Sequence, residues 1–291
     1  MKYNEKNSKE QLHGKGEAAA LKAIVWIAGI ATMAVLIFLI LYILINGLPH
    51  IKPSLFSIHY NSQNVSLFPA MINTLTMVGL SILFAGPIGI FSAVYLAEYA
   101  KRGSKFVAFI RLTSETLTGI PSIIFGIFGM LMFVDACHMG YSMLAGALTL
   151  ALMILPVIMR ATEEALHAVP DSYREGSLAL GSGKWHMIRT VVLPSSIDGI
   201  VTGCILAIGR IVGESAALLF TAGMANNILS IKDAVTPGNA GSTLTVALYM
   251  YAKERGEFGV AFAIAAILLI LTLIINLSAK LVAKKLKVKV D

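Results

Sequence analysis

The sequence is short of charge. Only 13% of its 291 residues are Asp, Glu, Lys or Arg, whereas 57% are hydrophobic, and the mean hydropathy is +0.78. Because a soluble domain carries about 25% charged residues, this chain has too few charges to cover a surface in water. The deficit excludes a soluble enzyme, a nucleic-acid-binding protein and a disordered tail. It predicts an all-α polytopic membrane protein.

Cysteine is also scarce. The two cysteines, Cys137 and Cys204, lie 67 positions apart, with no CxxC motif and no histidine nearby at ligand spacing. A disulfide framework or a zinc site needs more ligands than these. We therefore expect no metal site and no cofactor.

The N-terminus lacks a secretory cleavage site. Residues 1–22 are too long and too polar for the basic segment of a signal peptide, and no small-residue cleavage motif follows the first apolar run. We interpret residues 1–22 as a cytoplasmic tail and the run that follows as a retained membrane span.

Long apolar runs dominate the rest of the sequence. A bilayer crossing needs about 20 largely apolar residues. Residues 98–116 start with charges and suit a helix in the membrane interface, before the chain turns at residues 119–121. Six windows satisfy the length requirement and predict about six transmembrane helices: 23–48, 69–97, 117–135, 141–159, 197–222 and 258–279.

No linker is long enough to separate two folded domains. After the tail of residues 1–22, we assign 23–68 to the first span and an external loop. Residues 69–279 form the transmembrane domain, whose largest polar insert is 160–196, and residues 280–291 form a basic cytoplasmic tail.

The placement of Lys and Arg predicts the orientation. With the N-terminus inside, 18 of the 23 basic residues lie in cytoplasmic segments, four lie in external segments, and Arg210 lies within a span. Cytoplasmic loops of membrane proteins carry such an excess. Both termini and residues 160–196 are thus predicted to be cytoplasmic. The net charge of +7 then reflects this topology and an anionic leaflet of membrane lipid, not binding to nucleic acid.

The insert 160–196 contains the signals of a short helix that docks onto a partner. Pro170 breaks the preceding helix, residues 173–180 can form the short helix, and Gly181 ends it with a positive φ angle. A merely solvated loop is the alternative, but such loops rarely hold so many apolar side chains. The apolar residues of the helix are Tyr173, Leu178 and Leu180, and its polar rim is formed by Arg174 and Glu175.

A fixed spacing runs through the same insert. Glu175-Gly176-Ser177 is followed by three residues and Gly181, and nine residues later by Val191-Val192-Leu193-Pro194. This resembles the Glu-Ala-Ala, Gly and Ile-x-Leu-Pro pattern of integral-membrane subunits of binding-protein-dependent ABC importers. The resemblance implies that residues 170–180 seat in a cleft of an ATPase subunit. The residues it assigns to ATPase coupling are Tyr173, Arg174, Glu175, Gly181, Leu193 and Pro194.

The chain has no ATP site of its own. The nearest approach to a phosphate-binding loop is Gly183-Lys184, but Trp185 stands where Ser or Thr is needed and Leu178 where the first Gly is needed. We therefore predict a transport subunit that is not an enzyme. ATP hydrolysis is assigned to a separate polypeptide.

Two charges, Arg210 and Glu214, lie inside the fifth apolar window. A charge at mid-bilayer costs at least about 2.5–3.5 kcal/mol. One interpretation is an i, i+4 ion pair that locks this helix to a neighbour. The other is a substrate pathway in which the planar guanidinium of Arg210 binds a tetrahedral oxyanion and Glu214 tempers that binding.

The segment around these charges resembles phosphate importer permeases of the PstA type. Gly209-Arg210 and Gly213-Glu214 match the pattern of that family, whereas Ser215 and Ala217 replace its Thr and Pro. The resemblance runs from about residue 69 to the end and includes Tyr95-Leu96-Ala97-Glu98-Tyr99.

The resemblance implies an ABC importer type I permease-like bundle that transports inorganic phosphate. It implies a heterodimer with a second, homologous permease, two ATPase subunits and an extracytoplasmic phosphate-binding protein. A permease for sulfate, molybdate or phosphonate is the near alternative. An ion-coupled secondary carrier is the distant one, although a carrier typically has several intramembrane carboxylates.

Overall fold

The computed structural model describes residues 2–58, 65–101 and 103–286. These residues form helices joined by short loops, without a β-strand among them, which confirms the all-α prediction. The membrane-spanning helices and their neighbours are α1 (Lys2–Gly47), α2 (Phe68–Val94), α3 (Lys105–Thr118), α4 (Ser122–Gly129), α5 (Met143–His167), α8 (Leu193–Val212) and α12 (Phe258–Leu286).

The shorter elements lie between these helices. Four of them are π-helical turns: η3 (Tyr95–Tyr99), η4 (Met130–Ala136), η5 (Ile188–Val192) and η6 (Met250–Glu254). The others are η1 (Leu48–His50), η2 (Pro53–Phe56), α6 (Asp171–Ala179), α7 (Lys184–Met187), α9 (Ala216–Leu219), α10 (Ile231–Ala234) and α11 (Leu244–Tyr249).

Among the described residues, five helical segments are long and apolar enough to cross a membrane. A sixth crossing is formed if α3 is counted together with the helix that runs from Ser122 to Ala136, although the two halves meet at 102°. The bend lies at the predicted turn, since Pro121 cannot continue the helix that ends at Thr118. The five unbroken segments are Leu21–His50, Phe68–Tyr99, Met143–His167, Lys184–Val212 and Phe258–Val282.

The predicted fifth window, 197–222, was placed too far along the chain. The helix starts at Lys184, continues through η5 into α8 and ends at Val212. A new short helix, α9, follows because the Glu214 carboxylate accepts a hydrogen bond from the Ala217 N–H, at 3.1 Å, and caps its first turn. The third window was also misplaced, because its first residues belong to α3 and the turn.

The centre of the molecule is made by α2, α5 and α8. Met77 on α2 and Leu150 and Ile154 on α5 are fully buried in one apolar cluster. Close contact between α5 and α8 depends on glycine, because a Cβ added at Gly199 or Gly203 would overlap with an alanine of α5. These closely packed helices form the core of the bundle.

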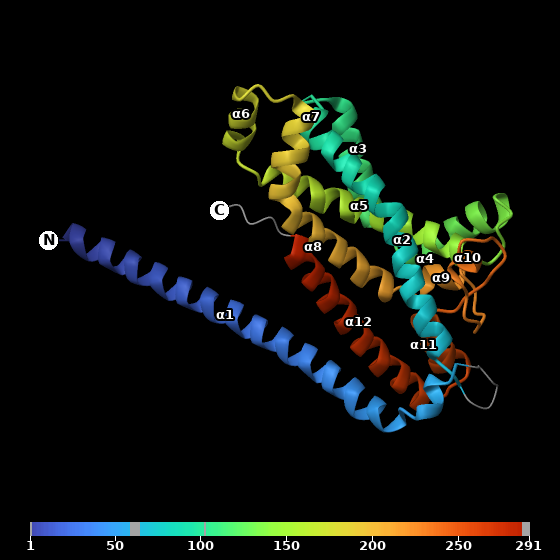
Figure 1. The fold of residues 1–291 in the computed structure, drawn as a ribbon. Helices are drawn as coiled ribbons and strands as arrows, with labels where there is room; N and C mark the ends of the chain where they lie inside the picture. The colour runs from blue at the N-terminus through green and yellow to red at the C-terminus, as the bar shows by residue number, and fades with distance from the viewer. Residues whose placement is uncertain (1, 59–64, 102, 287–291) are drawn as a thin grey trace.

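The first span, within α1, lies outside this centre. Its 18-residue apolar window has no buried residue, and α1 meets α12 near one end, where the Tyr42 and Phe262 rings pack edge to face. Figure 1 shows α1 diverging from α12 toward the N-terminus. It also shows the first turns of α1, the last turns of α12 and α6 toward the same end of the molecule, away from α11.

Candidate functional site

The α6 helix stands apart from the bundle (Figure 1), and none of its residues is buried. Leu180, directly after the helix, is 90% exposed, and Tyr173 and Leu178 are each 48% exposed. Apolar side chains are rarely left in water as a cluster unless a partner covers them. A short helix forms where one was predicted, but it spans Asp171–Ala179 instead of 173–180. With Leu180 it presents an uncovered apolar surface.

Gly181 ends α6 in the predicted conformation, with a φ of +83°. The Gly181 N–H donates to the Leu178 carbonyl at 2.9 Å and the Ser182 N–H to the Ser177 carbonyl at 3.3 Å. These two bonds form a Schellman motif, which satisfies the last carbonyls of the helix and requires a left-handed residue. The turn fixes the direction in which the chain leaves α6.

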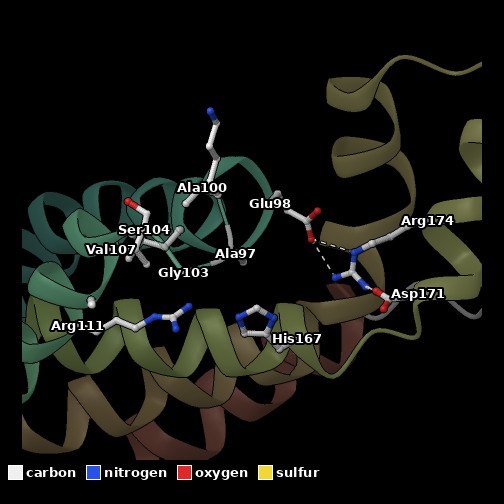
Figure 2. A pocket seen from close by; sticks show the side chains of 13 residues that line it. Ala97, Glu98, Ala100, Gly103, Ser104, Val107, Arg111, His167, Asp171 and Arg174 are labelled. Atoms are coloured by element: carbon white, nitrogen blue, oxygen red, sulfur yellow. Dashed lines mark hydrogen bonds and ion pairs between the residues drawn. The ribbon is translucent and has the colours of Figure 1, made fainter.

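Arg174 was predicted to lie on the polar rim of α6. In the structure, the side chain of Arg174 is only 15% exposed and lies on the inner side of the helix. Figure 2 shows its guanidinium pointing back toward Glu98. Nε and Nη2 donate to Glu98 Oε1 at 3.1 and 2.9 Å, while Nη1 donates to Asp171 at 3.1 Å. The carbonyls of Val169 and Leu166 accept further bonds at 2.6 and 2.7 Å. Arg174 therefore anchors α6 to the bundle.

A polar cavity of about 750 Å³ lies beside this anchor, between the end of α2 and the end of α5. Arg111 and His167 line it from the side opposite Ala97 and Ser104 (Figure 2). The nearly buried Glu163 forms an ion pair with Arg111 and lies 3.6 Å from His167. A carboxylate thus balances the basic groups on this wall of the cavity.

The other predicted coupling residues lie within α6, at its end or at the start of α8. Glu175 is exposed, and Leu193 and Pro194 are half-buried in the first turn of α8. Tyr173, Gly181 and Pro194 line one cavity of about 790 Å³ between α6 and the start of α8. The structure therefore brings these three predicted residues together and places Arg174 on the inner side of α6.

Arg210 lies in the last turn of α8 and is half-buried. Within the described parts of the chain its guanidinium has no hydrogen bond or ion pair. Glu214 is 8% exposed. Its carboxylate caps α9, and its backbone carbonyl accepts a bond of 2.7 Å from the Thr245 hydroxyl. The i, i+4 ion pair does not form, because α8 ends between the two residues.

Glu98 and Tyr99 were not predicted as site residues. Both lie in η3, the π-helical turn that ends α2. Glu98 meets Arg174, and the Lys184 ammonium lies 5.0 Å from the centre of the Tyr99 ring. The available signal was their position in a family-like segment, but nothing in the sequence indicates a partner 76 residues away.

The fold is that of the membrane subunits of ABC importers. The chain is similar to a subunit of the inward-facing MetNI methionine ABC transporter, with a TM-score of 0.57 and 19% identity over 76% of this chain and 94% of that one. It is also similar to a chain of a bacterial ABC transporter that imports the acidic polysaccharide alginate, with a TM-score of 0.61 and 16% identity over 87% and 95%.

Residues 85–288 match the family model of the binding-protein-dependent transport system inner membrane component, and the chain belongs to this family. It is 38% identical to the probable ABC transporter permease protein YqgI of Bacillus subtilis, over 85% of this chain and 88% of that protein. It is 35% identical to the phosphate transport system permease protein PstA of Haemophilus influenzae, over 83% and 85%. The chain is therefore a multi-pass inner-membrane permease.

Proposed function

We propose that this chain is a permease subunit of an ATP-driven importer for inorganic phosphate. The observation that carries the proposal is similarity to phosphate permeases over most of the chain. Besides the Haemophilus influenzae protein, PstA 1 of Mycobacterium tuberculosis is 37% identical over 74% of this chain and 70% of its own length. Arg210 lies in a membrane-spanning helix and has no hydrogen bond or ion pair among the residues that the structure describes, and its guanidinium supplies a chemical basis for oxyanion transport.

Arg210 is the proposed contact for phosphate in the pathway. A guanidinium offers two parallel N–H donors that match two oxygens of a tetrahedral anion. Within the described chain it is not occupied by an ion pair, and Glu214 is instead engaged at the start of α9. Glu214 thus shapes the backbone next to Arg210, and phosphate is the partner that the guanidinium lacks.

The proposed partners are a second, homologous permease, two ATPase subunits and an extracytoplasmic phosphate-binding protein. The exposed apolar surface of Tyr173, Leu178 and Leu180 supports docking of α6 into an ATPase. ATP hydrolysis occurs in that partner, since Trp185 and Leu178 replace the residues that a phosphate-binding loop requires. ATP-driven closure of the ATPases would displace α6 and switch the bundle between outward and inward access.

The proposed orientation places both termini and α6 in the cytoplasm. Figure 1 supports it, because the first turns of α1, the last turns of α12 and α6 lie toward the same end of the molecule. The excess of Lys and Arg in these segments supports it independently, because positive loops stay inside.

Transport by the reconstituted complex tests the substrate. Liposomes that contain the permease pair and the ATPases, with ATP inside and the binding protein outside, should accumulate labelled phosphate. Excess unlabelled phosphate should compete, whereas sulfate, molybdate and a phosphonate should not. Uptake that one of those anions blocks equally would favour the near alternative, and uptake without ATP would favour an ion-coupled carrier.

A further inference from the structure

The π-helical turn η3, at the end of α2, contacts both sides of the loop that carries α6. Glu98 contacts Arg174 on α6, and the Tyr99 ring lies under the ammonium of Lys184, the first residue of α7. An ammonium at this distance from an aromatic ring is attracted to its face. Two consecutive residues of η3 therefore contact the segments before and after Gly181.

The contact between Glu98 and Arg174 is nearly closed to solvent. The side chains are 6% and 15% exposed, and two guanidinium N–H groups donate to the same carboxylate oxygen. A shielded pair of this kind is costly to break, because either charge left alone remains buried without a counter-ion. The pair therefore resists any separation of α6 from the end of α2.

The same guanidinium also binds the end of α5. Its bonds to the carbonyl of Leu166, in the last turn of α5, and to that of Val169, two residues after the helix, tie the guanidinium to the chain where it leaves α5. One side chain thus joins the ends of α2 and α5 to α6. Since α6 has no buried residue of its own, polar contacts rather than a hydrophobic core fix its position.

The bundle end of this connection is rigid. From η3 the chain continues back into α2, whose Met77 and Leu80 are buried in the central cluster with α5 and α8. A force on α6 is therefore passed to α2 along a continuous helix, in addition to passing along the loop into α8.

We propose that Glu98 and Arg174 are positioning residues that convert displacement of α6 into movement of α2. The inference rests on the proposed function in one respect, namely that an ATPase supplies the displacement. It assigns to the end of α2 a part in coupling ATP hydrolysis to transport. Without the pair, α6 would still dock on the ATPase but would move without carrying α2.

The test compares Glu98→Ala and Glu98→Gln with Asp171→Asn in the full reconstituted complex. Asp171→Asn is the matched control, because Asp171 contacts the same guanidinium but its side chain is 70% exposed, where an ion pair contributes little. Glu98→Ala should keep ATPase co-purification and ATP turnover within about twofold and lower the phosphate moved per ATP about tenfold, since it removes a shielded pair. Glu98→Gln, which keeps an acceptor for Arg174, should be intermediate, and Asp171→Asn should match the unmodified protein.

A wild-type ratio of phosphate to ATP in Glu98→Ala would overturn the inference, as would an equal loss in Asp171→Asn. In a variant that still assembles, a parallel fall in ATP turnover and transport, with the ratio unchanged, would also overturn it, because that pattern indicates a purely structural pair. If Glu98→Ala fails to assemble, the ratio in Glu98→Gln decides.

Hydrogen–deuterium exchange of the same complexes separates this inference from the proposed function. The amides of α6 should exchange faster in Glu98→Ala than in the unmodified or Asp171→Asn complexes, whatever anion is transported. If the unmodified complex moves no phosphate but the exchange pattern holds, the substrate assignment fails and the positioning role stands. Unchanged exchange in α6 would contradict the positioning role.

Discussion

At the scale of single residues, the sharpest expectation concerns Arg210, the proposed contact for phosphate. Arg210→Gln should leave expression normal, because the guanidinium makes no hydrogen bond or ion pair with the rest of the described chain that the variant would break. Phosphate uptake should fall about 10- to 100-fold, which corresponds to the loss of about 1.5–3 kcal/mol from a hydrogen bond to a charged group. Labelled-phosphate uptake at matched expression measures the effect. Arg210→Lys, which keeps the charge without the planar fork, should retain part of the activity.

Glu214→Gln provides the matched control at the neighbouring position. The amide oxygen of Gln can still accept the Ala217 N–H, so α9 keeps its cap, and transport should stay near normal. If the double variant Arg210→Gln with Glu214→Gln restores uptake, the two residues act as a structural pair and Arg210 does not contact phosphate.

Gly181 is the second residue with a sharp expectation. Its φ of +83° costs a β-branched residue about 1–2 kcal/mol, so Gly181→Val should redirect the end of α6, weaken ATPase docking and abolish uptake. Gly183→Val is the control, because Gly183 has a φ of −72° and a ψ of 156°, an extended conformation that valine favours. Co-purification with the ATPase and uptake measure both variants. Normal transport by Gly181→Val would show that this turn does not matter for coupling.

Local residue roles could be predicted where local geometry determines them. The positive φ of Gly181 follows from a helix that ends next to a glycine, and the structure confirms it. Arg174 was predicted on the polar rim, but its role depends on Glu98, 76 positions away. No periodicity of the sequence encodes that distance, because only the tertiary placement of η3 next to α6 creates the contact.

At the scale of elements, the exposed surface of α6 should act as a docking surface. Leu180→Glu should leave the permease folded, because Leu180 is 90% exposed, yet it should reduce co-purification of the ATPase by placing a charge where an apolar contact forms. Ala168→Glu adds the same charge at an exposed position before α6 and should have little effect. Equal ATPase recovery with Leu180→Glu would place the docking surface elsewhere.

Helix existence was predictable from the sequence, and helix ends less so. Apolar composition indicates spans because the bilayer imposes it, and the bend before Pro121 follows from proline geometry. The end of α8 was missed since the segment stays apolar beyond Val212. The carboxylate of Glu214 caps the new helix α9 just after α8 ends. The mean hydropathy of a window hardly changes with one capping residue, so it does not show where α8 ends.

At the scale of the whole molecule, the proposed topology predicts which side of the membrane each loop occupies. In a chain with Cys137 and Cys204 replaced by serine, a cysteine at Ser182 should be protected from an impermeant thiol reagent in intact cells. A cysteine at Ile231, which is 77% exposed on α10, should react from outside. Labelling of the Ser182 position in intact cells would contradict the proposed orientation. As a control, disruption of the membrane should make the cysteine at that position accessible to the reagent.

The architecture of the bundle could be predicted from the sequence, whereas the position of α1 could not. Resemblance along residues 69–291 predicted the importer bundle, and the family match over residues 85–288 agrees with it. The position of α1 away from the centre has no such local signal, because every face of its apolar window is compatible with lipid or with another subunit. The sequence of one chain therefore predicts the packing within that chain better than the surfaces that contact lipid or other subunits.

Uptake of labelled phosphate by cells that lack this chain tests the central claim most directly. The deletion strain should lose ATP-dependent, high-affinity phosphate uptake while sulfate and molybdate uptake stay unchanged. Expression of the unmodified chain should restore it, and expression of Arg210→Gln to the same level should not. Unchanged phosphate uptake in the deletion strain, with loss of another oxyanion's uptake instead, would contradict the assignment of phosphate as the substrate.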